Sequence, residues 1–137
     1  MRKVSCLFGA LILSIGLISC GGSGSDGGIN NPPPPPPTCA ANTFCMSSGS
    51  SFFIDGGGTT LSVAANTAVT WTNDSGIPHD VTFDDPTTAL AVGGGSAGNI
   101  PQPASGSHQR QFAVSGSTHP FHCIIHGTPM HGTLNVL

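Results

Sequence analysis

Short stretches in which apolar and polar residues alternate recur along the chain from residue 39 to its end, separated by Gly, Asn, Asp and Pro. They are rich in Val, Thr, Phe and Trp, and a period of two is typical of half-buried β-strands. The expected strands are Ser50–Asp55, Thr59–Val63, Thr67–Asn73, His79–Phe83, Gln109–Val114, His119–Cys123 and Thr133–Leu137. Many short strands with almost no helical pattern predict an all-β, single-domain antiparallel sandwich or barrel with Greek-key connections.

The longest interruption of this strand pattern runs from Asp84 to Ser107. Its Gly and Pro content favours a long loop with at most one helical turn. No internal repeat is visible in the sequence.

Residues 1–19 have the pattern of an export signal, because Arg2 and Lys3 precede an apolar stretch from Leu7 to Ile18. This stretch is shorter than the roughly 20 apolar residues that a membrane-spanning helix needs. It ends in Leu-Ile-Ser-Cys20, which resembles the lipobox of bacterial lipoproteins, where cleavage leaves the cysteine to carry lipid. We expect an exported lipoprotein that faces the periplasm or lies at the cell surface. An ordinary cleaved signal and an uncleaved anchor are the alternatives.

The segment 20–38 is expected to be a linker between the lipidated Cys20 and a folded domain. Apart from Ile29 it has no apolar residue to bury, so it cannot offset the entropy of ordering. Its Gly/Ser part is predicted to be flexible, and Pro32–Pro37 to be a stiff polyproline II spacer, with docking of a Pro-binding module as the alternative. Residues 39–137 are enough for one hydrophobic core, and we expect a monomer.

The charge excludes a nucleic-acid-binding function. The whole chain has three Lys or Arg residues and six acidic ones, for a net charge of −3 with neutral histidines. Removal of residues 1–19 leaves Arg110 as the one Lys or Arg residue, so the mature net charge is −5. Such a chain offers no basic surface to phosphates.

The cysteines have separate expected roles. Of the five, Cys6 leaves with the signal and Cys20 is the lipidation candidate. Export implies an oxidising compartment, so Cys39 and Cys45 are expected to form a disulfide. Cys123 is then unpaired, and its neighbours are metal ligands by residue type.

Cys123, His126 and Met130 have a Cys-x2-His-x3-Met spacing that a tight turn between strands can direct at one point. Thiolate, thioether and imidazole together favour copper, because Met is a poor ligand for zinc. A second imidazole is available from His79, which directly follows Pro78 at the start of an alternating strand. Strands distant in sequence lie side by side in a Greek key, which makes such a combination natural.

The segments Val69–Phe83 and Gln109–Leu137 resemble the two copper-binding segments of the cupredoxin family, small blue copper proteins such as plastocyanin, pseudoazurin and amicyanin. The resemblance implies a cupredoxin-like sandwich that binds one type 1 copper ion and carries single electrons between redox partner proteins. It implies that electrons leave through His126, framed by Ile77, Pro78 and Pro129. The implied strong ligands are His79, Cys123 and His126, and the implied weak axial ligand is Met130.

Three details differ from the family pattern or leave a choice open. The loop between His126 and Met130 has three residues, between the lengths of amicyanin-like and plastocyanin-like loops. Asp80 follows the first ligand histidine, where many blue copper proteins have asparagine, and places a potential charge beside the thiolate. His131 is an alternative axial ligand to Met130 by proximity in sequence.

His108, His119 and His122 are interpreted as surface or edge residues. The dipeptide His122-Cys123 resembles that of copper nitrite reductases, in which the histidine holds a second copper ion. A further ligand histidine of those enzymes corresponds to Asp84 here, so a ligand for that second ion is missing. Three functions therefore stay open: an electron carrier, a copper storage or delivery protein favoured by the surplus histidines, and a copper enzyme, which needs an open coordination position.

Overall fold

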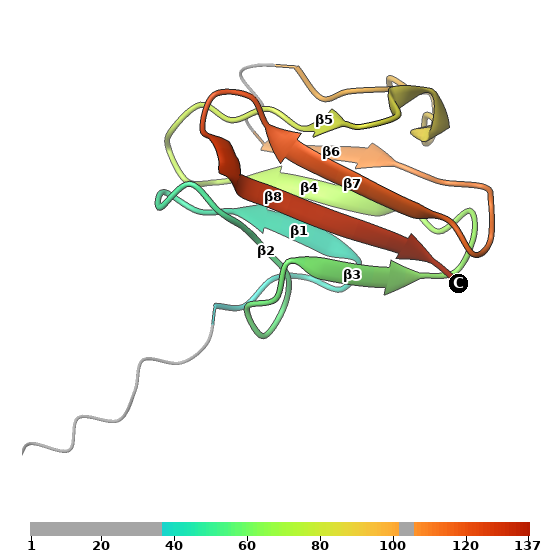
Figure 1. Cartoon of the computed structure of the whole chain (residues 1–137), viewed down its shortest axis with the longest axis horizontal. Helices are drawn as coiled ribbons and strands as arrows, with labels where there is room; N and C mark the ends of the chain where they lie inside the picture. The colour runs from blue at the N-terminus through green and yellow to red at the C-terminus, as the bar shows by residue number, and fades with distance from the viewer. Residues whose placement is uncertain (1–36, 102–105) are drawn as a thin grey trace, which may run out of the picture. The chain divides into compact units, whose positions relative to one another are not determined.

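The computed structural model describes residues 37–101 and 106–137, and the strands of this part form two four-stranded sheets (Figure 1). One sheet has the order β2-β1-β4-β6 and the other the order β3-β8-β7-β5. Their bounds are β1 Thr43–Met46, β2 Phe52–Phe53, β3 Thr60–Val63, β4 Val69–Asn73, β5 Thr82–Phe83, β6 Gly106–Arg110, β7 Thr118–Cys123 and β8 Gly127–Val136. The predicted all-β Greek-key class is confirmed.

A single 3-10 turn, η1 (Pro86–Thr88), interrupts the strands of the described residues. It lies in the long insert between β5 and β6, where at most one helical turn was predicted. Across residues 37–101 and 106–137, no helix has the length and apolar character needed to cross a bilayer. The predicted signal 1–19, the lipidation site Cys20 and most of the linker lie outside the described residues.

The sheets are mixed, so the prediction of an antiparallel sandwich is wrong for two of the six ladders among the described residues. β1 pairs with β4 in parallel, and β3 pairs with β8 in parallel, while the other ladders are antiparallel. Alternation along one strand shows which face is buried, but it carries no information on the direction of the neighbouring strand. Strands that are not joined by a hairpin can pair in either direction.

Three strands differ from their predicted positions. β1 was not predicted at all, because three of its four residues are buried and the alternation is masked. β6 was expected at Gln109–Val114 but runs from Gly106 to Arg110, a polar edge strand held by its ladder with β4. β8 begins at Gly127, six residues before its expected start at Thr133.

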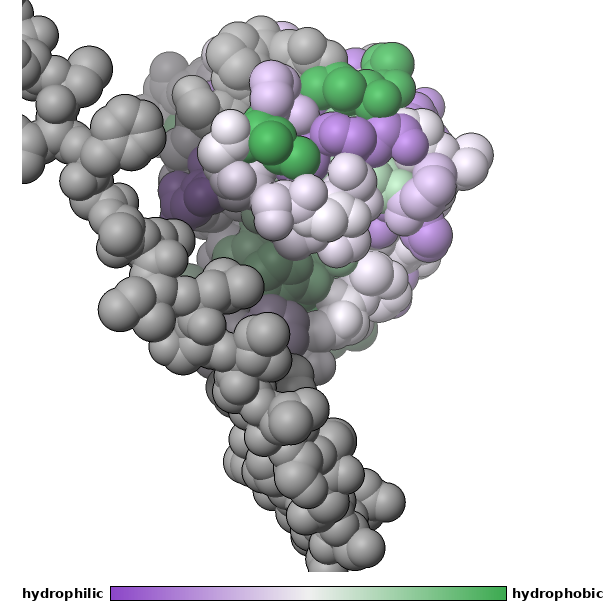
Figure 2. Space-filling view, turned by 90° about the vertical axis from the view of Figure 1, so that its left-hand side faces the viewer, coloured by the Kyte–Doolittle hydropathy of each residue, from purple (hydrophilic) through white to green (hydrophobic). Residues whose placement is uncertain are grey.

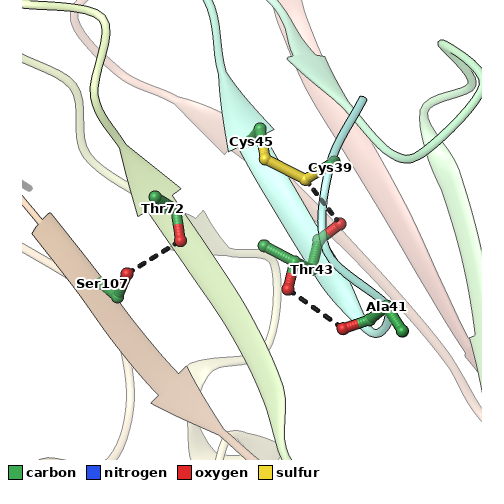
Figure 3. The surroundings of a disulfide bond; sticks show 6 residues. All are labelled: Cys39, Ala41, Thr43, Cys45, Thr72 and Ser107. Atoms are coloured by element: carbon green, nitrogen blue, oxygen red, sulfur yellow. Dashed lines mark hydrogen bonds between the residues drawn. A yellow bond between two sulfur atoms is a disulfide. The ribbon is translucent and has the colours of Figure 1, made fainter. Parts of the chain in front are cut away.

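A disulfide attaches the start of the described chain to β1 (Figure 3). The structure joins Cys39 to Cys45, and the Thr43 hydroxyl donates to the carbonyl of Ala41 at 3.1 Å. Cys45 is half-buried between the buried residues of β1, on the face of the sheet turned away from the core. The first strand is therefore held by a covalent bond outside the core as well as by its ladders.

Phe121 of β7 is the centre of an aromatic core between the sheets. Its ring lies 4.8 Å from that of Phe44, 5.0 Å from Phe52 and 5.5 Å from Trp71, centroid to centroid, with edge-on geometry. Each of these rings is buried, and such pairs stabilise a core beyond the area they bury. β7 is thus fixed two residues before Cys123, which is the last residue of the strand.

The insert between β5 and β6 is attached to the sandwich by Arg110. This buried guanidinium donates to the carbonyls of Gly98 at 2.6 Å and Asn99 at 2.9 Å. Val81 and Ile100 add a two-way backbone bridge at 2.9 Å each way. The chain just after His79 is therefore hydrogen-bonded to the insert as well as to the neighbouring strand of its own sheet.

Candidate metal centre

His79, Cys123 and His126 lie close together in the structure. They lie in loops and at a strand end, at the end of the sandwich toward which β7 runs (Figure 1). His79 lies in the loop between β4 and β5, Cys123 ends β7, and His126 lies in the turn before β8. β5 and β7 pair directly, with Thr82 opposite His122 and Phe83 opposite Phe121. This ladder brings a histidine far away in the sequence to the end of the strand that carries the cysteine.

The three ligand atoms lie at distances that suit one metal ion. His79 Nδ1 and His126 Nδ1 are 3.2 Å apart, and Cys123 Sγ lies 3.4 Å from His126 Nδ1 and 3.9 Å from His79 Nδ1. Ligands at roughly 2.0–2.3 Å from one ion lie about 3–4 Å from one another. The cluster His79, Cys123 and His126 could therefore hold a copper ion, and it is the one such cluster found within the described ranges.

Burial affects the protonation of His79 and Cys123. His79 and Cys123 are fully buried, while His126 is partly exposed. Burial lowers the pKa of His79, and the neighbouring imidazole of His126 lowers it further. Burial also raises the pKa of the Cys123 thiol. A neutral imidazole is ready to donate its lone pair, whereas the thiol must lose a proton to bind a metal.

Asp80 connects the two segments that carry the residues of this cluster. Its Oδ1 accepts the backbone N–H of Ile124 at 2.9 Å and the thiol of Cys123 at 3.1 Å, and its Oδ2 accepts the Thr82 hydroxyl at 2.8 Å. The side chain is almost fully buried. The sequence suggested a charge beside the sulfur at this position, but the hydrogen bond to the turn after Cys123 becomes visible only in the structure.

A bulge in β8 accounts for the position of Met130. His122 pairs with His131, but Cys123 pairs with Gly127, so the residues 128–130 have no partner in β7. Bulges of this kind redirect side chains next to functional sites. Met130 is fully buried and belongs to the same core cluster as Cys123, whereas His131 is exposed.

Neither a protein-family model nor a curated protein sequence matches the chain. Solved structures do: the purple cupredoxin of Nitrosopumilus maritimus is 21% identical at a TM-score of 0.51, over 69% of this chain and 98% of that one. The reduced Cu(I) form at pH 4 of an amicyanin mutant is 22% identical at a TM-score of 0.51, over 74% of this chain and 86% of that one. The chain has the cupredoxin fold. The fold expected from the two resembling segments is thereby confirmed.

Within this cupredoxin fold, the remaining histidines do not join the cluster. His119 was expected at the surface or at an edge, but the structure buries it. Its Nδ1 lies 3.1 Å from the Thr88 hydroxyl, its Nε2 lies 2.7 Å from the Ser117 hydroxyl, and its ring packs on Phe112 at 4.4 Å. The alternating pattern of β7 placed His119 on the inner face with Phe121, and this signal was available in the sequence.

The surface around the cluster is apolar where the turn after Cys123 reaches solvent. Ile124 is 65% exposed and Ile125 is 40% exposed, next to the partly exposed His126. Figure 2, which views this end of the cupredoxin fold, shows hydrophobic side chains at the surface beside hydrophilic ones. The two isoleucines therefore expose apolar surface directly beside His126.

Proposed function

We propose that the protein is a type 1 copper protein that carries single electrons between redox partner proteins outside the cytoplasm. The convergence of two Nδ1 atoms and one sulfur within 3.2–3.9 Å, in a cupredoxin fold, is the observation that carries the proposal. Copper would supply the one-electron Cu(II)/Cu(I) couple when bound.

The residues of this chain perform the rest. His79, Cys123 and His126 are the proposed equatorial ligands, and buried Met130 is the proposed weak axial ligand in preference to exposed His131. Soft sulfur ligands favour Cu(I), and imidazoles accept Cu(II) as well. The packed aromatic core and the Asp80 hydrogen bonds hold the ligands in one arrangement for both oxidation states, which keeps reorganisation small.

The partly exposed His126 is the proposed exit for electrons, and the apolar surface of Ile124 and Ile125 is the proposed docking surface for partners. We further propose that residues 1–19 direct export, that Cys20 carries lipid, and that the linker 20–38 keeps the domain close to membrane-bound redox partners. In this proposal the chain acts as a monomeric carrier rather than as an enzyme.

The test is the visible and electron paramagnetic resonance spectrum of the Cu(II)-loaded protein. We expect an intense thiolate-to-copper absorption that the Cys123→Ser variant lacks and that the His108→Gln variant, altered on the other sheet, retains. Met130→Leu is expected to change the paramagnetic resonance parameters without abolishing the colour. A colourless Cu(II) form, or a Cys123→Ser variant that stays coloured, excludes the proposal.

A further inference from the structure

The outer face of the β3-β8-β7-β5 sheet holds a second group of metal-ligand side chains, separate from the buried cluster. A surface pocket of about 470 Å³ is lined by Asp84, His122 and His131, together with Pro120, Ile124 and Thr133. Its volume lies in the range of pockets that bind small ligands. Neither imidazole is used by the proposed type 1 site.

The two histidines face each other across the ladder of β7 and β8. His122 and His131 are directly paired in the register. Residues at opposite positions on one face have Cβ atoms about 4.5–5.5 Å apart. Their neighbours Phe121, Cys123 and Met130 are buried, so both imidazoles point outward, away from the core.

Asp84 adds a carboxylate beside the first imidazole. Its Oδ1 lies 3.6 Å from His122 Nδ1, and its backbone N–H donates to the carbonyl of Pro120 in β7 at 3.1 Å. The backbone of Asp84 is therefore fixed at the edge of β7. A carboxylate in this position can serve as a metal ligand.

The tautomer of His131 suits a ligand. Its Nδ1 lies 3.0 Å from the carbonyl oxygen of Thr128. A carbonyl only accepts, so Nδ1 carries the proton and Nε2 carries the lone pair. Histidines that bind metals usually donate their other N–H in this way, to a carbonyl or a carboxylate.

We propose that His122, His131 and Asp84 form a second metal site, for a divalent transition-metal ion of the zinc type. Two imidazoles and one carboxylate suit such an ion, whereas calcium and magnesium take mainly oxygen ligands. The ligand atoms of these three side chains do not converge as those of the buried cluster do, so binding an ion requires the side chains to rotate. The side chains of His122 and Asp84 are 40% and 59% exposed, which leaves room for that rotation. Three protein ligands leave a position for water.

The test is titration of the full chain with Zn²⁺ in a Cys123→Ala background, which removes the sulfur of the buried cluster and keeps a small apolar side chain there. We expect one tightly held equivalent by calorimetry. His131→Gln and Asp84→Asn, each in that background, should weaken it about tenfold or more. The matched control His108→Gln, altered on the other sheet, should bind as the background protein does.

Imidazole ¹H–¹⁵N spectra identify the ligands directly. Zinc is expected to shift the ring signals of His122 and His131 and to leave those of His79 and His126 in place. Shifts confined to His79 and His126, or zinc affinity unchanged in both His131→Gln and Asp84→Asn, overturn the second site. The colour of the Cu(II) form of the unaltered protein tests the type 1 proposal separately, so the two can fail independently.

Discussion

Asp80 combines two roles in one side chain, because the oxygen that holds the turn after Cys123 is also the oxygen beside the sulfur. Oδ1 lies 2.9 Å from the Ile124 nitrogen and 3.1 Å from Sγ. An asparagine can accept the same backbone N–H through its own Oδ1. The substitution Asp80→Asn therefore separates the charge of this residue from its hydrogen bond.

We expect Asp80→Asn to raise the reduction potential of the copper-loaded protein. A carboxylate next to the centre stabilises the more positive Cu(II) form, on the order of 1–4 kcal/mol for unit charges about 4 Å apart at effective dielectric constants of about 80 to 20. Spectroelectrochemical titration measures the change, and Asp55→Asn, at an exposed position outside the cluster, is the matched control. An unchanged or lowered potential in Asp80→Asn would show that this charge does not act on the centre.

At the level of single residues, the identity of the candidate ligands could be predicted from the sequence, but the contacts between residues in different loops could not. His79, Cys123 and His126 stand out because soft and imidazole ligands are rare in a chain made mostly of small residues, and the structure brings these three together. The hydrogen bond from Ile124 to Asp80 could not be predicted, because it depends on the distance between two loops. The pocket that joins His131 to Asp84 could not be predicted for the same reason.

The ring of Phe121 in β7 packs directly against Gly132 in β8. The two residues are directly paired, and a Cβ added to Gly132 would overlap the ring of Phe121. Because the Phe121 ring is held by Phe44, Phe52 and Trp71, it cannot turn aside freely. The glycine is therefore required for this strand pair and for the position of the strand end that carries Cys123.

Gly132→Ala is expected to destabilise the protein by about 1–3 kcal/mol, the usual cost of overpacking a core. Urea unfolding monitored by Trp71 fluorescence gives the free energy of unfolding. Gly49→Ala is the matched control, because its added Cβ would meet only the Ser47 hydroxyl oxygen at 3.7 Å. Equal stability of the two variants would mean that the aromatic core adapts without cost.

The disulfide of β1 is expected to contribute stability without contributing to the metal centre. Cys39 and Cys45 are six residues apart, and closing so short a loop in the unfolded chain is worth about 2 kcal/mol. The double variant Cys39→Ser/Cys45→Ser should unfold at lower urea concentration and keep the visible absorption of the copper form. Loss of that absorption at urea concentrations where the variant is still folded would contradict this separation.

Strand positions were predictable where one face alone is buried. β4 alternates strictly between buried and partly exposed residues, and the structure places it within its expected range. β6 has one buried residue among five, so the hydrophobic pattern shifted its expected position toward Phe112. Its true position depends on backbone pairing with β4, for which the sequence carries no local signal.

For the molecule as a whole, the sequence was sufficient for the all-β class and insufficient for the order and direction of the strands. The parallel ladders join β1 to β4 and β3 to β8, pairs that are not connected by hairpins. Such pairs form because the hydrophobic faces of both sheets close on one core around Phe121. The same closure buries His79 and His119. Because these imidazoles are buried, we expect the free energy of unfolding to depend on pH.

Acidification is expected to destabilise the protein without copper. Burial lowers the pKa of both His79 and His119 in the folded protein below the usual histidine value of about 6.5. The unfolded chain therefore binds more protons than the folded one as the pH falls below about 6.5, and stability decreases there. Above that pH both states are neutral at these residues, and their contribution to the pH dependence disappears.

His119 provides the sharper test, because it lies outside the metal cluster. His119→Gln keeps a side chain that can reach the Thr88 and Ser117 hydroxyls but removes the titrating group. Free energies of unfolding in urea at pH 7.5 and pH 5 should therefore differ less in this variant than in the unaltered protein. His108→Gln, altered at a partly exposed histidine on the other sheet, should keep the full difference. If His119→Gln keeps it too, the acid sensitivity of the fold arises at His79 or elsewhere, and the burial of His119 has no thermodynamic consequence.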